Sequence, residues 1–346
     1  MNIKKNNFEK IFRGDYCFVI AEAGSNHNQN FDTARQLVDA ASDARADAVK
    51  FQFFMADEIA ADTKHPIAIL DNGKSLHQFY KELETPREWI PELSAYCRQK
   101  DILFMATAFD LHAVDLLEAV KMEIYKIASF EIVDIPLLKK IARTQKPIIL
   151  STGMANDEDI DDALNAIYEE GDSKVVVLHC GINYPVPFNE VNLRAMETIK
   201  KKFNVPVGYS DHTSGLTVPI AAVALGAKVI EKHFTLNREQ DGPDHSFAVE
   251  PHELKQMVRS IRECNSSLGS SVKGCSESEE IHYKRGRRSL FASRDIQKDD
   301  LLTMECFSIL RPGIGLKPKH IYELVGKMAK KGFKKNEAVD WGIIKR

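Results

Sequence analysis

The chain alternates short apolar runs with longer stretches in which apolar residues recur at helical spacing. Each apolar run covers four or five residues rich in strand formers, and a polar or glycine-containing turn usually follows it. These runs predict eight strands, at residues 17–21, 48–51, 102–105, 124–127, 147–150, 175–178, 205–209 and 228–232. The intervening stretches predict amphipathic helices that include residues 31–45, 86–100, 134–144, 158–168, 191–203, 217–225 and 251–268.

Strands that are apolar along their whole length are typical of a parallel sheet covered by helices on both faces. Eight strand–helix units in about 250 residues predict an α/β fold of the (β/α)8 TIM-barrel type, which we assign to residues 1–270. A doubly wound open sheet is the alternative, because periodicity alone does not show that a sheet closes. The long segment 55–84 is expected to lie over one end of the barrel.

The pattern changes after the predicted barrel. Residues 271–287 are rich in serine, glycine and glutamate and end in a basic run, so we interpret them as a linker. Residues 288–346 alternate short β-like runs with turns such as Arg311-Pro-Gly-Ile-Gly315, which predicts a second, small domain. A domain of about 60 residues is marginally stable alone, so we expect it to pack against the barrel or a second subunit.

Composition narrows the class of protein. With 44% hydrophobic and 28% charged residues among 346, the chain has the profile of a soluble globular protein. A formal net charge of −3 provides no general attraction to nucleic acid. No apolar run reaches the ~20 residues of a membrane span, and the first residues are too polar for a signal peptide. Six scattered cysteines without CxxC spacing predict free thiols and a cytoplasmic location.

Lysines inside apolar strands are the first candidates for chemistry. In barrel enzymes the functional side chains project from the C-terminal ends of the strands. An unpaired ammonium group is costly to bury, so Lys50 and Lys126 are expected to face an anion or a polar pocket. Lys232 could instead be structural, paired with Glu231 or another barrel carboxylate. Serines near the same strand ends would complete a phosphate or carboxylate site. They are Ser129, Ser151 and Ser210.

Two histidines lie at equivalent positions of consecutive strands. His212 follows the seventh predicted strand and His233 the eighth, so their side chains should lie side by side at the barrel end. Two imidazoles with further carboxylate or water ligands suit manganese, cobalt or zinc, and two ligands alone do not select among them. Glu22 and Asp244 could bind a hydroxylated substrate or transfer protons.

Several motifs occur together along the chain. In the barrel they are Ala21-Glu-Ala-Gly-Ser-Asn-His-Asn28, Ala46-Asp-Ala-Val-Lys-Phe-Gln52, Tyr125-Lys-Ile-Ala-Ser129, Leu150-Ser-Thr-Gly-Met154, Gly208-Tyr-Ser-Asp-His-Thr213, Gly226-Ala-Lys-Val-Ile-Glu-Lys-His-Phe-Thr-Leu236 and Gly242-Pro-Asp-His245. In the small domain they are Arg288-Ser-Leu-Phe-Ala-Ser293 and Arg311-Pro-Gly313. Through these motifs nearly the whole chain resembles the sialic acid synthases and their relatives, the nonulosonic acid synthases, which carry a C-terminal antifreeze-like (SAF) domain.

The resemblance implies a reaction and roles for individual residues. Enzymes of this family condense phosphoenolpyruvate with an N-acylated hexose and release phosphate by C–O cleavage. His212 and His233 would hold a divalent metal, manganese or magnesium, with cobalt possible. The phosphoenolpyruvate ligands would be Lys50, Thr107, Lys126, Ser129, Ser151 and Ser210. The sugar ligands would be Glu22, Gln52, Tyr184 and Asp244, of which Glu22 and Asp244 are the catalytic candidates.

Two further substrate-binding residues carry over with the resemblance. Asn183 lies in a loop that departs from the family pattern, one position later than the asparagine of some members. Arg311 of the small domain would reach into the barrel of a partner subunit and bind the N-acyl group of the sugar. The resemblance therefore implies a domain-swapped homodimer.

The identity of the sugar is left open by the residues. N-Acetylmannosamine, giving N-acetylneuraminate, is the leading acceptor, and a diacetamido-trideoxy hexose, giving legionaminate or pseudaminate, is the alternative. Phe130 is similar to the pseudaminate branch, whereas Asp244-His245 is similar to the sialic type. Two more distant hypotheses are a pyruvate-dependent aldolase, which would need a Schiff-base lysine or enolate site, and a non-catalytic carbohydrate-binding protein.

Overall fold

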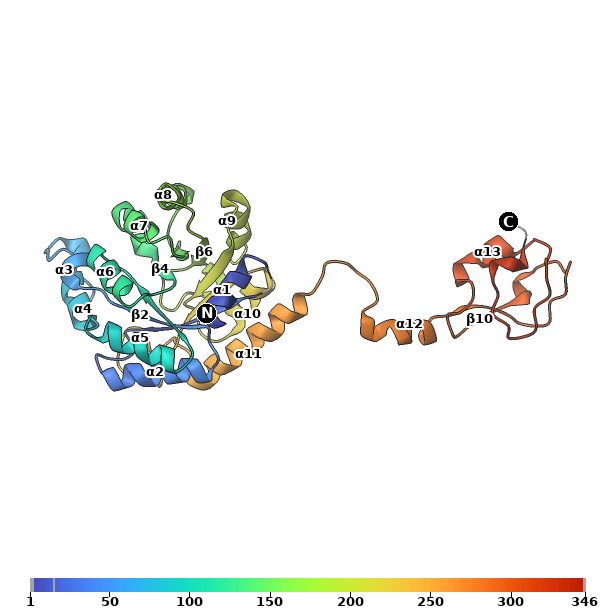
Figure 1. Cartoon of the computed structure of the whole chain (residues 1–346), viewed down its shortest axis with the longest axis horizontal. Helices are drawn as coiled ribbons and strands as arrows, with labels where there is room; N and C mark the ends of the chain where they lie inside the picture. Colours follow the sequence, from blue (N-terminus) through green and yellow to red (C-terminus); the bar gives the residue numbers. More distant parts are fainter. Residues whose placement is uncertain (1–2, 15, 345–346) are drawn as a thin grey trace. The chain divides into compact units, whose positions relative to one another are not determined.

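The computed structural model describes residues 3–14 and 16–344. These residues form two compact units, Met1–Gly269 and Ser270–Arg346, and each unit is described separately (Figure 1). Within the described residues all six cysteines are free. In the same residues no helix is both long enough and apolar enough to cross a membrane.

The first unit contains a closed barrel of eight parallel strands in sequential order. Pairing of β1 with β8, from Phe18 beside Val229 to Glu22 beside His233, completes the circle. The predicted barrel is therefore confirmed, and the alternative of an open sheet is wrong. The strands are β1 Phe18–Gly24, β2 Ala48–Gln52, β3 Leu103–Thr107, β4 Tyr125–Ile127, β5 Ile148–Ser151, β6 Val175–Cys180, β7 Val207–Asp211 and β8 Val229–His233.

A layer of helices surrounds the strands (Figure 1). Their apolar stripes pack on the outer face of the barrel and form the larger hydrophobic core. The helices are α2 Phe31–Asp43, α5 Trp89–Gln99, α6 Leu111–Ala119, α7 Ile135–Ala142, α8 Asp157–Tyr168, α9 Ala195–Phe203, α10 Thr217–Ala224 and α11 Pro251–Leu268. Helix α6 was not among the predicted helices, because its nine residues are mostly apolar and lack a clear amphipathic pattern.

The N-terminal helix covers the end of the barrel at which the strands begin. In α1, Ile3–Ile11, the side chains of Phe8 and Ile11 join a buried cluster inside the barrel. Phe18 and Leu103, at the first positions of β1 and β3, belong to the same cluster. The interior at this end is apolar and filled, which leaves the C-terminal ends of the strands as the place for a polar site.

The second unit is small and partly β. Strands β9, Ser289–Ala292, and β10, Phe307–Leu310, pair in antiparallel fashion over a core of its own, which also includes residues of α13, Ile321–Leu324. Within the segment predicted as a linker, residues Glu280–Gly286 form helix α12. Hydrogen bonds from Gly313 N to Lys284 O and from Arg311 Nε to Gly286 O join α12 to this unit.

Candidate active site

Strand register brings the predicted polar residues together at the C-terminal end of the barrel. Glu22 on β1 is paired with Lys50 on β2 and with His233 on β8. Thr107 on β3 is paired with Lys126 on β4. None of these side chains is more than 4% exposed, so their charges meet with little screening by water.

The two strand lysines are held by different partners. Lys50 Nζ lies 2.9 Å from Glu22 Oε2 and donates a hydrogen bond to Thr107 Oγ1 at 3.0 Å. Lys126 Nζ donates to Ser151 Oγ at 2.7 Å. Gln52 donates from Nε2 to the other oxygen of Glu22 at 2.7 Å. Lys50 and Lys126 thus belong to two separate hydrogen-bonded groups at the same end of the barrel.

A further carboxylate, Glu231, lies between the lysines. Its Oε1 is 3.7 Å from Lys126 Nζ and its Oε2 is 3.8 Å from Lys50 Nζ. Ser210 Oγ donates a hydrogen bond to Oε1 at 3.0 Å. The sequence had suggested Glu231 only as a partner for Lys232, which instead pairs with Asp211 at 2.7 Å.

Strand alternation could have revealed the position of Glu231. Successive side chains of a strand point to opposite faces, so Glu231 and His233 share one face of β8 while Lys232 lies on the other. The same rule places Asp211 on the face of β7 opposite Ser210.

Burial and neighbouring charges set the protonation of this network. Burial raises the pKa of Glu22, and Lys50 only partly opposes that effect. Burial would also raise the pKa of Glu231, but Lys126 and Lys50 outweigh it and hold that pKa below its usual value. For Lys50, burial lowers the pKa, and Glu22 and Glu231 together outweigh burial and raise it. Glu231 and Lys50 are thus ionised at neutral pH.

His212 and His233 lie side by side, with ring centroids 5.3 Å apart. His212 Nδ1 lies 2.6 Å from Gly181 O, so Nδ1 carries the proton and the lone pair of Nε2 is free. His233 Nδ1 is 3.4 Å from Asp244 Oδ2 and has no hydrogen-bond partner among the described residues. Burial lowers the pKa of both rings, which keeps them neutral and able to donate a lone pair.

Within the part of the chain that the structure describes, no third metal-ligating side chain joins the two histidines. Among the described residues, no group of three or more His, Cys, Asp or Glu side chains has a metal-binding arrangement. Two neutral imidazoles, of which the His233 ring has a buried Nδ1 without a hydrogen-bond partner among the described residues, nevertheless fit a divalent cation that takes its other ligands from substrate or water.

The remaining predicted residues divide into those near this cluster and those away from it. The ring of Tyr184 lies 4.4 Å from the ring of His212. Ser129 Oγ accepts a hydrogen bond from Gly153 N at 3.0 Å, beside the thiol of Cys180. Asn183 is exposed and donates to Glu190 Oε2 at 3.3 Å, so the structure does not bring it into the cluster.

Arg311 belongs to the second unit. It is exposed there, and its Nε donates to Gly286 O at 2.7 Å.

A cavity of about 600 Å³ opens beside the cluster. Gln52, Tyr184, His233 and Asp244 line its polar side. The apolar side comes largely from the segment 55–84, which contains α3, Ala56–Ile59, and α4, Leu76–Leu83. This wall comprises Phe54, Ile59, Ala60, Ala61, Ala68, Leu76, Phe79, Leu83, Phe109 and Phe130. A mixed lining of this kind suits a small ligand that carries both polar and apolar groups.

Glu131 follows the fourth strand and also lines this cavity, although no binding or catalytic role was predicted for it. Its Oε2 is buried without a hydrogen-bond partner among the described residues. Burial raises the pKa of Glu131 to about 7, although Lys126 opposes the shift. The carboxyl group is therefore able to donate or accept a hydrogen bond at neutral pH.

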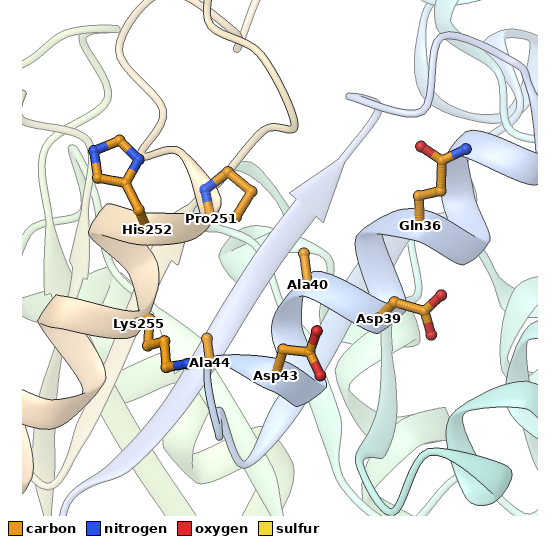
Figure 2. A pocket seen from close by; sticks show the side chains of 8 residues that line it. All are labelled: Gln36, Asp39, Ala40, Asp43, Ala44, Pro251, His252 and Lys255. Atoms are coloured by element: carbon orange, nitrogen blue, oxygen red, sulfur yellow. The ribbon is translucent and has the colours of Figure 1, made fainter.

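A second hollow, of about 410 Å³, lies on the outer wall between α2 and α11. Figure 2 shows Gln36, Asp39 and Asp43 from α2 and His252 and Lys255 from α11. None of its lining residues comes from a strand end, so it lacks the features of the site described above.

Comparison with protein families covers both units. A model described as the NeuB family matches residues 37–273. A model described as the SAF domain matches residues 287–343.

Individual relatives extend along most of the chain. The N,N'-diacetyllegionaminic acid synthase of Campylobacter jejuni subsp. jejuni serotype O:2 is 42% identical over 327 residues, covering 93% of this chain and 98% of that protein. The N-acetylneuraminate-9-phosphate synthase of Homo sapiens is 32% identical over 321 residues, covering 90% and 88%. The crystal structure of N-acetylneuraminic acid synthetase from Leptospira borgpetersenii serovar Hardjo-bovis, in complex with citrate, has a TM-score of 0.71 at 35% identity. It covers 78% of this chain and 92% of that one.

Proposed function

The chain belongs to the NeuB family and is an enzyme of the nonulosonic acid synthase type, and from this premise we propose how its site works. Its substrates are phosphoenolpyruvate and an N-acylated hexose. The observation that carries the proposal is the pair of buried lysines and their hydroxyl partners, which lie at strand ends neighbouring two neutral histidines.

Lys50 and Lys126 hold phosphoenolpyruvate. The phosphate and carboxylate groups of this substrate need several charge-assisted hydrogen bonds, which buried ammonium groups supply. The hydroxyl groups of Thr107, Ser151 and Ser210 lie within hydrogen-bond distance of members of the same charge network. Positioning of this anion beside the acceptor supplies a large part of the rate, because it turns a two-substrate encounter into an intramolecular step.

For the metal we propose a divalent cation on His212 and His233. Imidazole ligands favour manganese over magnesium, which prefers an all-oxygen shell, and cobalt is a further candidate. When bound, the cation polarises the aldehyde oxygen of the acceptor. Asp244, whose Oδ2 lies 3.4 Å from His233 Nδ1, contacts the sugar beside that ring.

Glu22 is the proton-transfer residue of the proposed reaction. The enol carbon of phosphoenolpyruvate forms a bond to the acceptor aldehyde carbon, and the aldehyde oxygen takes up a proton and becomes a hydroxyl group. The second carbon of phosphoenolpyruvate becomes electron-deficient. Water adds at that second carbon, and phosphate leaves when its C–O bond breaks. Glu22 lies 2.9 Å from Lys50, and burial raises its pKa, so it can take a proton from the water.

For the acceptor we propose a diacetamido-trideoxy hexose, with N-acetylmannosamine as the second candidate. Identity is 42% with the diacetyllegionaminic acid synthase and 32% with the N-acetylneuraminate-9-phosphate synthase. The apolar wall from segment 55–84 adds a physical argument, since a deoxygenated, doubly acetylated sugar has more apolar surface to bury. The leading hypothesis from the sequence was N-acetylmannosamine, and these two observations favour the alternative.

We also propose that two chains form a domain-swapped homodimer. Arg311, exposed in the second unit, would then bind the N-acyl group of a sugar in the partner's barrel. Among the described residues only the Nε of Arg311 has a hydrogen-bond partner, so the terminal NH2 groups of its exposed guanidinium are suited to such a contact.

Phosphate release tests the proposal. The enzyme is incubated with phosphoenolpyruvate and, in turn, N-acetylmannosamine, its 6-phosphate and the diacetamido-trideoxy hexoses. We expect release to be fastest with a diacetamido-trideoxy hexose, to stop with a chelator and to return with manganese. Absence of release with every acceptor would contradict the proposed reaction. Product formation from pyruvate would instead support an aldolase.

A further inference from the structure

A protein carboxylate lies within the group of side chains that we assign to phosphoenolpyruvate. Glu231 is 4% exposed, and it lies between the two lysines, 3.7 Å from Lys126 Nζ and 3.8 Å from Lys50 Nζ. Ser210, another member of the group, donates a hydrogen bond to it. No described residue forms a hydrogen bond with its Oε2. The site for an anionic substrate thus contains an anion of its own.

Neither lysine has Glu231 as its nearest partner. Lys50 lies closer to Glu22, at 2.9 Å, and Lys126 donates its short hydrogen bond to Ser151, at 2.7 Å. Charges less than 4 Å apart still interact strongly when water is nearly excluded. Glu231 therefore attracts both ammonium groups, and their hydrogen bonds to other residues stay intact.

We propose that Glu231 is a positioning residue, an internal counter-ion that fixes the spacing of Lys50 and Lys126 and offsets part of their positive charge. This inference rests on the proposed function, because it takes both lysines as ligands of phosphoenolpyruvate. Without Glu231 the two buried ammonium groups would repel each other and move apart. The same carboxylate also repels the phosphate and carboxylate of the substrate.

Neutralisation of Glu231 should therefore have two opposite effects. Phosphoenolpyruvate should bind more tightly because a negative charge is removed from its site. Turnover should slow because the lysines leave the spacing that the reaction needs. A purely structural residue would weaken binding and turnover together, so the split between the two measurements distinguishes the roles.

The experiment uses Glu231→Gln in the full-length chain. Calorimetric titration with phosphoenolpyruvate alone should show a Kd about tenfold lower than that of the wild type, and kcat for phosphate release should fall at least about tenfold. Glu231→Ser, also neutral, repeats the test if the glutamine variant does not fold. Glu231→Asp keeps the charge, so its Kd should stay within about twofold of the wild-type value and part of kcat should return.

Glu169→Gln is the matched control. Its carboxylate lies 2.8 Å from Lys139 Nζ on the exposed outer surface, so the same substitution should leave Kd and kcat unchanged. Unchanged or weaker binding in the neutral Glu231 variants would overturn the inference, as would equal tightening in Glu231→Asp. A wild-type protein that binds no phosphoenolpyruvate would overturn the proposed function itself, which is a separate outcome.

Discussion

Individual side chains at the barrel end are arranged by strand alternation and charged or neutral according to their burial. Glu231 and His233 share one face of β8, whereas Lys232 on the opposite face pairs with Asp211 and ties β8 to β7. Burial then keeps His233 neutral and raises the pKa of Glu22. His233 and Glu22 thus provide a lone pair and a proton acceptor, beside the positive charge of Lys50.

Glu22→Gln should abolish turnover while phosphoenolpyruvate binding survives. The amide keeps the size of the side chain and can still accept a hydrogen bond from Lys50 through its oxygen, whereas its NH2 group faces Gln52. It cannot accept a proton from water. We expect phosphate release to fall at least about a hundredfold, within the range of general-base catalysis. Calorimetry with phosphoenolpyruvate provides the binding control. Wild-type turnover by this variant would exclude the proposed role.

Glu131 should make stability depend on pH. Its pKa rises from 4.5 to about 7 in the folded chain, so between these values the folded state holds a proton that the unfolded state has lost. The stability contributed by protonated Glu131 is therefore complete below pH 4.5 and is lost as the pH rises through about 7. The melting temperature of Glu131→Gln, relative to wild type, should increase across this window and then level off. A constant difference from pH 4 to 8 would contradict the assignment.

At the scale of elements, the capping of helix α4 affects the shape of the cavity, because side chains of this helix line it. Ser75 and Gln78 form a reciprocal capping box at its start, with Ser75 Oγ accepting from Gln78 N at 3.1 Å. Leu76, Phe79 and Leu83 of the same helix line the apolar wall. The position of this wall therefore depends on a helix of only eight residues, which is short for independent stability.

Ser75→Ala should weaken acceptor binding more than phosphoenolpyruvate binding. Loss of the cap costs about 1 kcal/mol of stability and loosens α4. We expect KM for the sugar to rise severalfold with little change in KM for phosphoenolpyruvate. Asn156→Ala is the matched control, because Asn156 caps α8 in the same way and α8 contributes nothing to the cavity lining. Equal kinetic effects of both variants would rule out the link.

At the scale of the whole molecule, the residues of the proposed active site come from two units. The barrel carries the lysines, histidines and carboxylates of the site, and the small unit carries Arg311. The small unit has a hydrophobic core of its own. Its proposed contribution is one arginine for a partner's site.

Subunit complementation tests this division. Arg311→Ala and Glu22→Gln should each be nearly inactive alone. In a mixed dimer with swapped domains, one of the two sites regains both wild-type residues, so co-expressed and co-purified chains should recover about half the activity of a wild-type dimer. Without swapping, each site would keep one defect. No recovery in a confirmed mixed dimer would therefore contradict the proposed swap.

The amino-acid sequence by itself determined the number, order and type of the strands. Apolar runs such as 48–51 and 175–178 are strands in the structure, because a buried parallel strand needs apolar side chains on both faces. The strand-end rule also selected Lys50, Lys126 and the histidine pair, which the closed barrel does bring together at its C-terminal end. Local pattern was sufficient for these features because they depend on residues close in sequence.

The tertiary structure decided what depends on distant residues. Closure required the pairing of β1 with β8, some 200 residues apart in the chain, which periodicity does not encode. The position of Glu231 between two lysines, the buried Oε2 of Glu131 and the apolar wall from segment 55–84 arise only when separate strands and loops meet. Proximity in sequence, in turn, does not ensure proximity in the site. Asn183 is adjacent to Tyr184 in sequence, but its side chain donates a hydrogen bond to Glu190 and does not join the cluster. The protonation state of a side chain and the groups around it depend on tertiary packing, which brings together elements that are far apart in the chain.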